Sequence, residues 1–120
     1  MVFQGEVYFP PDPLPPGQRV NHRVVVLTPD GLLSRPGHVF VNVAIIRSAV
    51  RTDGTRAPLV PGHSIPVGPG VCSFLVRDSI VETHQLFALA LRDLTTLSRQ
   101  GRLPPPILAD VLAGARRLFS

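Results

Sequence analysis

The sequence predicts a mainly β (α+β) fold, in which a small, strongly curved β-barrel carries one C-terminal helix packed on the sheet. Short apolar segments recur along the chain, and segments that contain proline or glycine separate most of them. Only the last apolar segment has its apolar residues at helical spacing. Because 120 residues is the size of one domain, we expect a single domain over residues 1–120.

The N-terminal part should supply two strands. We expect the first at residues 5–9 and the second at residues 22–28, whose continuous apolar run predicts burial on both faces. Residues 10–18 contain five prolines in nine residues, so they should form a loop, because proline cannot pair inside a sheet. Residues 29–31, Pro-Asp-Gly, are typical of a turn.

The remaining strands follow the same pattern. Residues 38–46 should form the third and longest strand, with alternate apolar residues on its two faces. A loop is expected at residues 47–61, and further strands at residues 63–67, 72–76 and 80–91.

Helical structure is expected near the C-terminus. Residues 92–99 should form a brief helix that ends at Gly101. The final helix should begin at the three prolines 104–106, since a first-turn amide has no partner inside the helix. Its apolar residues recur at helical spacing: Ile107, Leu108, Val111, Leu112, Ala115, Leu118 and Phe119.

The composition favours a folded protein of the cytoplasm. Hydrophobic residues make up 44% and charged residues 17%, as in globular rather than disordered chains. No apolar run approaches the ~18 residues that cross a bilayer. Residues 1–6 lack the basic and apolar regions of a signal peptide. We therefore expect a cytoplasmic location and no membrane partner.

Metal and cofactor chemistry is not expected. Cys72 is the only cysteine, so there is no internal disulfide and no cysteine-based metal pattern, and we interpret it as a small core residue. The four histidines (His22, His38, His63 and His84) form no pair suited to one helix face. The sequence also lacks the paired carboxylates, glycine-rich phosphate loop and nucleophile motif of nucleotide-using enzymes and serine hydrolases.

The positive charge is carried by arginine alone. Twelve arginines oppose eight acidic residues, which gives a net charge of +4. Arginine suits planar, bidentate recognition of phosphate, although the absence of lysine is also explained by genomic base composition. The charge therefore permits a nucleic-acid partner without requiring one.

Three short segments resemble a known family when read in order: Gly5-Glu6-Val7-Tyr8, then residues 22–28, then residues 84–89. They resemble the MazF/PemK family of bacterial toxins. The resemblance implies an SH3-like barrel with added helices, and the toxin of a toxin–antitoxin pair that cuts single-stranded RNA or mRNA at specific sequences without a metal. It also implies a 2′,3′-cyclic phosphate and a 5′-hydroxyl as products, growth arrest, a small antitoxin with an acidic tail, and a homodimer.

The resemblance assigns catalysis to Arg23, at the mouth of the second strand. A guanidinium suits RNA cleavage because negative charge develops on the phosphoryl oxygens. Val24 stands where the family has proline, and Gln18 and Arg19 stand where its loop carries glutamate. The alternative is that Arg23 only ends a strand and pairs with a carboxylate.

The second catalytic position falls at the end of the third strand. The family threonine aligns with Ile46 or Arg47, and Ser48 follows at once. Two interpretations stay open: Ser48 supplies the catalytic hydroxyl while Arg47 binds phosphate, or catalysis is lost and Ser48 is a loop residue.

In the third segment, His84 stands where the family usually has an acid, before Gln85. Its imidazole suits acid–base chemistry or a hydrogen bond at a strand edge. The expected RNA contacts are Gln18, Arg19, His22, Arg47 and His84, beside the catalytic candidates Arg23 and Ser48. The departures from the family leave two alternatives, a CcdB-like gyrase poison and a catalytically inactive SH3-like binding module.

Overall fold

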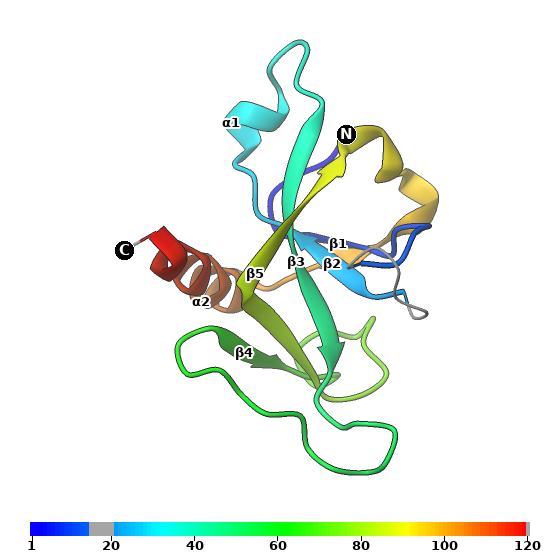
Figure 1. Cartoon of the computed structure of the whole chain (residues 1–120). Coiled ribbons are helices and arrows are strands. Elements are labelled where there is room, and N and C mark those ends of the chain that lie inside the picture. The colour runs from blue at the N-terminus through cyan, green and yellow to red at the C-terminus, as the bar shows by residue number, and fades with distance from the viewer. Residues whose placement is uncertain (15–20, 120) are drawn as a thin grey trace.

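The computed structural model describes residues 1–14 and 21–119. Six antiparallel strands form one strongly bent sheet, in the order β4-β5-β3-β2-β1-β6, and the C-terminal helix lies against it (Figure 1). This architecture confirms the predicted fold class. The elements are β1 (Glu6–Tyr8), β2 (Arg23–Val26), α1 (Asp30–Leu33), β3 (Phe40–Ser48), β4 (Ser64–Val67), β5 (Ser79–Ala90), β6 (Arg99–Arg102), α2 (Pro105–Arg116), and the 3₁₀ turns η1 (Leu91–Asp93), η2 (Thr96–Ser98) and η3 (Arg117–Phe119).

The sheet buries apolar side chains on both faces. Val25 and Ala44 belong to the core that includes Val111 of α2, whereas Val24 and Val43 belong to a second core on the other face. Because neighbouring residues of a strand point to opposite faces, an uninterrupted apolar run can only be buried in this way. The two-sided burial predicted for β2 and the alternation predicted for β3 are confirmed.

An irregularity in the register of β5 accompanies the bend of the sheet. Val43 of β3 pairs with Phe87, but Ile45, two residues later, pairs with Glu82. The additional β5 residues between these pairs form a bulge, which increases local twist and bends the strand. Beyond the bulge, the first part of β5 pairs with β4 as well as β3.

The strand predicted at residues 72–76 is wrong. These residues form turns, in which Cys72 and Leu75 are buried in the core beside α2 while Val76 is 77% exposed. A short apolar run can cover a core as a loop, and its periodicity does not distinguish this from a strand. Burial also raises the pKa of the Cys72 thiol, in agreement with the core role expected for it.

The helix predicted at residues 92–99 is also wrong. Two short 3₁₀ turns, η1 and η2, occupy this region, and Arg99 already begins strand β6. β6 is polar throughout because it lies at the sheet edge, where only one side pairs. In the described part of the chain, no helix has both the length and the apolar character needed to span a bilayer.

Candidate functional site

A cationic cavity forms where several strand ends meet. Antiparallel pairing sets Arg23, at the start of β2, beside Ile46 near the end of β3. Ser48, the last residue of β3, pairs with Ser79, the first of β5. The cavity between them measures about 240 Å³, and Arg23, His22, Arg47, Ser48 and Arg77 are among its lining residues. None of the described residues that line it is acidic.

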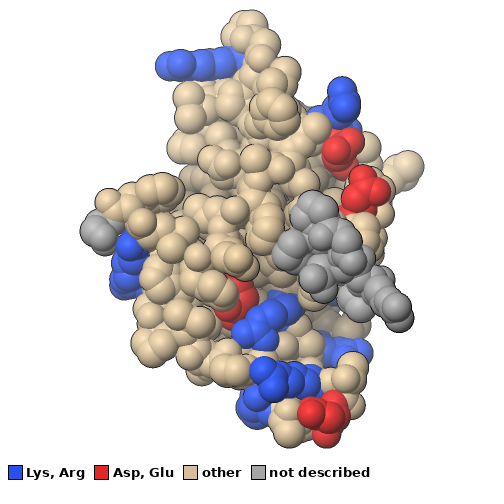
Figure 2. Space-filling view, in the orientation of Figure 1, with Lys and Arg blue, Asp and Glu red and all other residues tan. Residues whose placement is uncertain are grey.

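Basic side chains gather on this side of the molecule. Figure 2 shows basic side chains around the end of β3, with acidic side chains beside them and further basic side chains elsewhere on this face. A concave surface of one charge sign attracts ligands of the opposite charge, here an anion. We call the cavity and its lining residues the cationic cavity.

Arg23 is held at the cavity by weak contacts. Its guanidinium carbon lies 5.5 Å from the centre of the Phe9 ring, and its Nε donates to Oε1 of Gln100 over 3.4 Å. It forms no ion pair with a carboxylate of the described residues, so the predicted alternative, an arginine neutralised by a carboxylate, is not observed there. Its charge remains available to an anion.

Arg47 is fixed more firmly. Its Nη2 donates to the carbonyl of Pro58 over 3.0 Å and to Oε1 of Glu82 over 3.1 Å. The Glu82 carboxylate neutralises part of the positive charge of Arg47, and both partners fix the orientation of its guanidinium. Arg47 therefore offers a positioned but partly neutralised guanidinium.

Arg77 also lines the cationic cavity, although it is not among the RNA contacts expected from the sequence. It lies in the cavity wall in the segment before β5, is exposed, and forms no ion pair with any described carboxylate. It lies between the strands predicted at residues 72–76 and 80–91, and its place in a surface loop leading into β5 is the signal that could have indicated a binding arginine.

His22 is the imidazole of the cavity. Burial, and secondly the positive charge of Arg47, lower the pKa of its ring below the ordinary value of 6.5. At neutral pH the ring is therefore uncharged and able to accept a proton.

Ser48 lines the cavity, but its hydroxyl is already engaged. Its Oγ donates to the carbonyl of Val50 over 2.8 Å and lies 3.3 Å from the amide nitrogen of Val50, which donates to it. A ligand would have to replace the first of these bonds to receive a hydrogen bond from Ser48.

His84 does not line the cavity. Its Nδ1 lies 2.9 Å from Oε2 of Glu82, a contact with ion-pair distance but without hydrogen-bond alignment. Since Glu82 also holds Arg47, this carboxylate links His84 to the cavity. Gln85 is exposed and makes no side-chain hydrogen bond with the described residues, and Gln18 and Arg19 lie outside the described residues.

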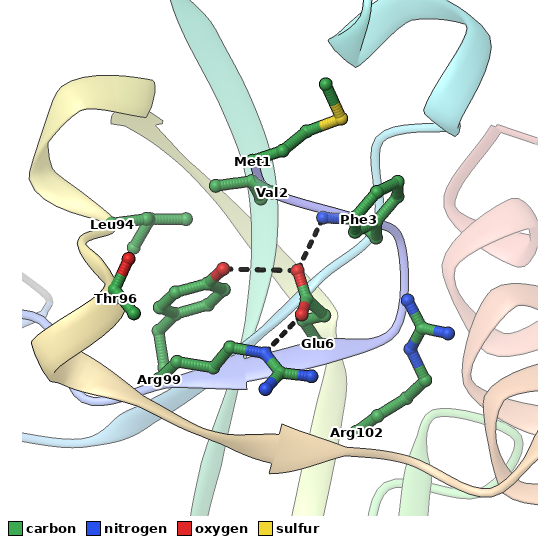
Figure 3. A pocket seen from close by; sticks show the side chains of 9 residues that line it. Met1, Val2, Phe3, Glu6, Leu94, Thr96, Arg99 and Arg102 are labelled. Carbon is green, nitrogen blue, oxygen red and sulfur yellow. Dashed lines mark hydrogen bonds and ion pairs between the residues drawn. The ribbon is translucent and has the colours of Figure 1, made fainter.

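A second cavity, of about 440 Å³, surrounds Glu6 beside β1 and β6 (Figure 3). Oε1 of the buried Glu6 accepts hydrogen bonds from the Phe3 amide over 2.6 Å and from the Tyr8 hydroxyl over 3.1 Å, and Oε2 pairs with Arg99. Both carboxylate oxygens are thus used in joining the N-terminal segment to β1 and β6. We interpret Glu6 as structural.

No protein-family model and no curated protein matches the sequence. Solved structures do match the fold. An endoribonuclease from a mycobacterial species, in complex with its cognate antitoxin, aligns with a TM-score of 0.69 and 12% identity over 99% of this chain and 95% of that chain. The Mycobacterium tuberculosis toxin MazF-mt6 aligns with a TM-score of 0.62 and 23% identity over 94% of this chain and 97% of that one.

These matches confirm the predicted architecture. The chain has the fold seen in these endoribonuclease toxins, and the match covers nearly all of it. Identities this low establish the arrangement of the strands and not the side chains of a site. The function of this chain therefore depends on its own side chains, above all those of the cationic cavity.

Proposed function

We propose that the protein is the toxin of a toxin–antitoxin pair and cleaves single-stranded RNA, including mRNA in the cytoplasm, at specific sequences. The observation that carries the proposal is the cationic cavity, on a fold shared with endoribonuclease toxins. The described residues that line it include three arginines and no carboxylate. Phosphate contacts dominate the affinity of proteins for nucleic acids, and arginine is the side chain best suited to them.

The proposed reaction needs no metal. The ribose 2′-oxygen forms a bond to the adjacent phosphorus and the bond from phosphorus to the 5′-oxygen breaks, which leaves a 2′,3′-cyclic phosphate and a 5′-hydroxyl. The attacking hydroxyl loses a proton, and the leaving oxygen takes one from solvent. Negative charge grows on the phosphoryl oxygens, and a preorganised donor directed at them lowers the barrier.

The charge and contacts of each residue of the cationic cavity indicate its role in this reaction. Arg23, which has no carboxylate partner among the described residues, donates to the phosphoryl oxygens. Arg77 and the anchored Arg47 hold neighbouring phosphates. His22, uncharged at neutral pH, accepts the proton of the 2′-hydroxyl. Ser48 supplies a further hydrogen bond once it leaves the Val50 carbonyl.

The Ser48 hydroxyl is already hydrogen-bonded to the Val50 carbonyl, which favours one alternative, in which the cavity binds RNA or another ligand without cutting it. In that case the protein is a binding module or a poison of another enzyme, such as gyrase. Cleavage and binding must therefore be measured separately.

The test is incubation of a long, unstructured RNA with purified protein in EDTA, followed by mapping of the ends. We expect cuts at a short repeated sequence with cyclic phosphate termini. Arg23→Ala should lower the rate by about 100-fold or more, as for loss of one transition-state donor. Arg116→Ala, which removes an exposed arginine of α2 outside the cavity, should cut normally. A folded wild-type protein that binds RNA without cutting it would support the alternative.

We also propose an antitoxin with an acidic segment, and a homodimer. The similar mycobacterial endoribonuclease is in complex with its cognate antitoxin, and a net charge of +4 suits an acidic partner. Such a segment would occupy the cationic cavity and compete with RNA. Light scattering of the free protein measures whether it forms a dimer.

A further inference from the structure

A third cavity adjoins the cationic cavity and shares Ser79 with it. It measures about 420 Å³ and lies beside the ends of β3 and β4 and the start of β5. Its walls are mostly apolar, from Leu59, Val67 and Val71, and it has two charged residues, Arg56 and Asp78. A cavity of this volume suits a small-molecule-sized group. We call it the side cavity.

Asp78 is the acidic residue among the described residues that line the side cavity. Its carboxylate forms no ion pair or side-chain hydrogen bond with any described residue. Its backbone is nevertheless fixed, because its carbonyl accepts a hydrogen bond from the Ala49 amide over 2.9 Å. The carboxylate lies directly over Gly68, where an added Cβ would be 2.9 Å from Oδ1. Asp78 is exposed, so its two hydrogen-bond-accepting oxygens lie at the solvent-facing rim of an apolar cavity, with no donor among the described residues.

The complementary ligand has flat apolar faces and an edge of N–H donors. A nucleobase has this chemistry, and bases of single-stranded RNA are read by their edges and stacked on apolar or guanidinium faces. Guanine presents two adjacent donors, N1–H and the N2 amino group, to a carboxylate, which can only accept. The other bases present a single donor group on this edge. An acidic peptide fits less well, since its carboxylates would face Asp78.

We propose that the side cavity binds a guanine base of the RNA whose phosphate occupies the cationic cavity, with Asp78 as the residue that selects guanine. This inference rests on the proposed function, and it identifies a specificity-determining residue that the cleavage chemistry does not need. Gly68 contributes to the same selectivity, because a side chain at this position would displace the Asp78 carboxylate.

The test measures binding and not cleavage. Fluorescence anisotropy is recorded with labelled hexanucleotides that carry 2′-fluoro sugars, which remove the attacking hydroxyl. The four oligomers are oligouridine with guanine, adenine, cytosine or uracil at one central position. The wild-type protein should prefer the guanine oligomer by about tenfold or more, the range of a bidentate base contact. Asp78→Asn should remove this preference and Gly68→Ala should weaken it.

Two controls separate this inference from the proposed function. Asp110→Asn makes the same charge change on the exposed surface of α2 and should keep the preference. Arg23→Ala should weaken the binding of all four oligomers equally, because phosphate carries no base identity. Circular dichroism verifies that each variant is folded.

Each remaining outcome overturns the inference in a recognisable way. If folded Asp78→Asn keeps the guanine preference, Asp78 does not select the base, although RNA binding stands. If Asp78→Asn leaves RNA binding unchanged but tightens binding of an acidic, leucine-containing peptide, the side cavity belongs to a protein partner. If the folded wild-type protein binds none of the oligomers, the inference and the proposed function fail together.

Discussion

Nη2 of Arg47 lies 3.1 Å from Oε1 of Glu82, whose side chain is only 6% exposed. The same oxygen accepts a hydrogen bond from Oγ of Ser64 over 3.0 Å, and Nδ1 of His84 lies 2.9 Å from the other oxygen. One carboxylate of β5 therefore connects residues of β3 and β4. It fixes the direction of an arginine that lines the cationic cavity.

We expect Glu82→Gln to loosen Arg47 without changing the size of the side chain. The free energy of unfolding should fall by about 1–2 kcal/mol, the usual effect of losing a charged hydrogen bond that is partly open to solvent. RNA cleavage should fall several-fold, because a mobile guanidinium no longer holds its phosphate in place. Ser64→Ala is the control, since it removes another partner of Glu82 and leaves the Arg47 contact. Normal cleavage by Glu82→Gln would mean that Arg47 needs no positioning.

The lowered pKa of His22 predicts a particular pH profile. If the uncharged imidazole accepts the 2′-hydroxyl proton, the single-turnover cleavage rate stays level through neutral pH. It falls only on the acid side of 6.5, where the ring becomes protonated. Arg47→Met removes the nearby positive charge and should move this fall to higher pH. His22→Gln should abolish it together with most activity, whereas His84→Gln should leave it. If the fall on the acid side persisted in the residual activity of His22→Gln, His22 would be excluded as the titrating group.

Helix α2 packs against β5 at Gly114. A Cβ at Gly114 would lie 2.4 Å from Oγ1 of Thr83 and 3.3 Å from the carbonyl of Gly62. Thr83 is fully buried and its hydroxyl donates to the carbonyl of His63, so it cannot move freely. Gly114→Ala should therefore lower the free energy of unfolding by about 1–3 kcal/mol, although alanine favours helices.

Chemical denaturation measures this effect, with Gly31→Ala as the control. Gly31 lies in α1 and a Cβ there would meet nothing within 4 Å, so its replacement should be neutral or slightly stabilising. If Gly114→Ala were as stable as the wild type, the expected clash with Thr83 would be wrong. Helix α2 would then be able to shift on the sheet with little loss of free energy of unfolding.

The fold could be predicted where the sequence pattern is strong. The apolar runs of β2 and β3 and the helical spacing of α2 each have a single reasonable interpretation. β6 could not be found in this way, because an edge strand with the sequence Arg-Gln-Gly-Arg has no apolar pattern. Its pairing with β1 is a long-range contact that only the folded chain reveals.

The candidate site was predicted only in part. Arg23, His22, Arg47 and Ser48 do meet in one cavity, since antiparallel pairing brings the start of β2 to the end of β3. The sequence could not indicate that the Ser48 hydroxyl is already bonded to Val50. Glu82 did leave a signal, because a charged residue inside the apolar run of β5 is expected to be paired when buried.

Tyr8, the only tyrosine of the chain, is buried and donates a hydrogen bond to Glu6. Burial, and then the charge of Glu6 and the hydrogen bond to it, raise the pKa of its phenol from 10.0 to about 12. Ultraviolet titration of the folded protein should therefore show no tyrosinate until well above pH 10. Between the two pKa values the unfolded chain loses this proton while the folded protein keeps it, so the free energy of unfolding should fall as pH rises.

Tyr8→Phe isolates this contribution. The variant should be about 1 kcal/mol less stable at neutral pH, because Glu6 loses one of its donors. Above pH 10 its stability should decline less steeply than that of the wild type, since no phenol remains to ionise. Parallel decline of both proteins would mean that the phenol of Tyr8 ionises equally in the folded and unfolded states, and that the Glu6 network does not hold its proton.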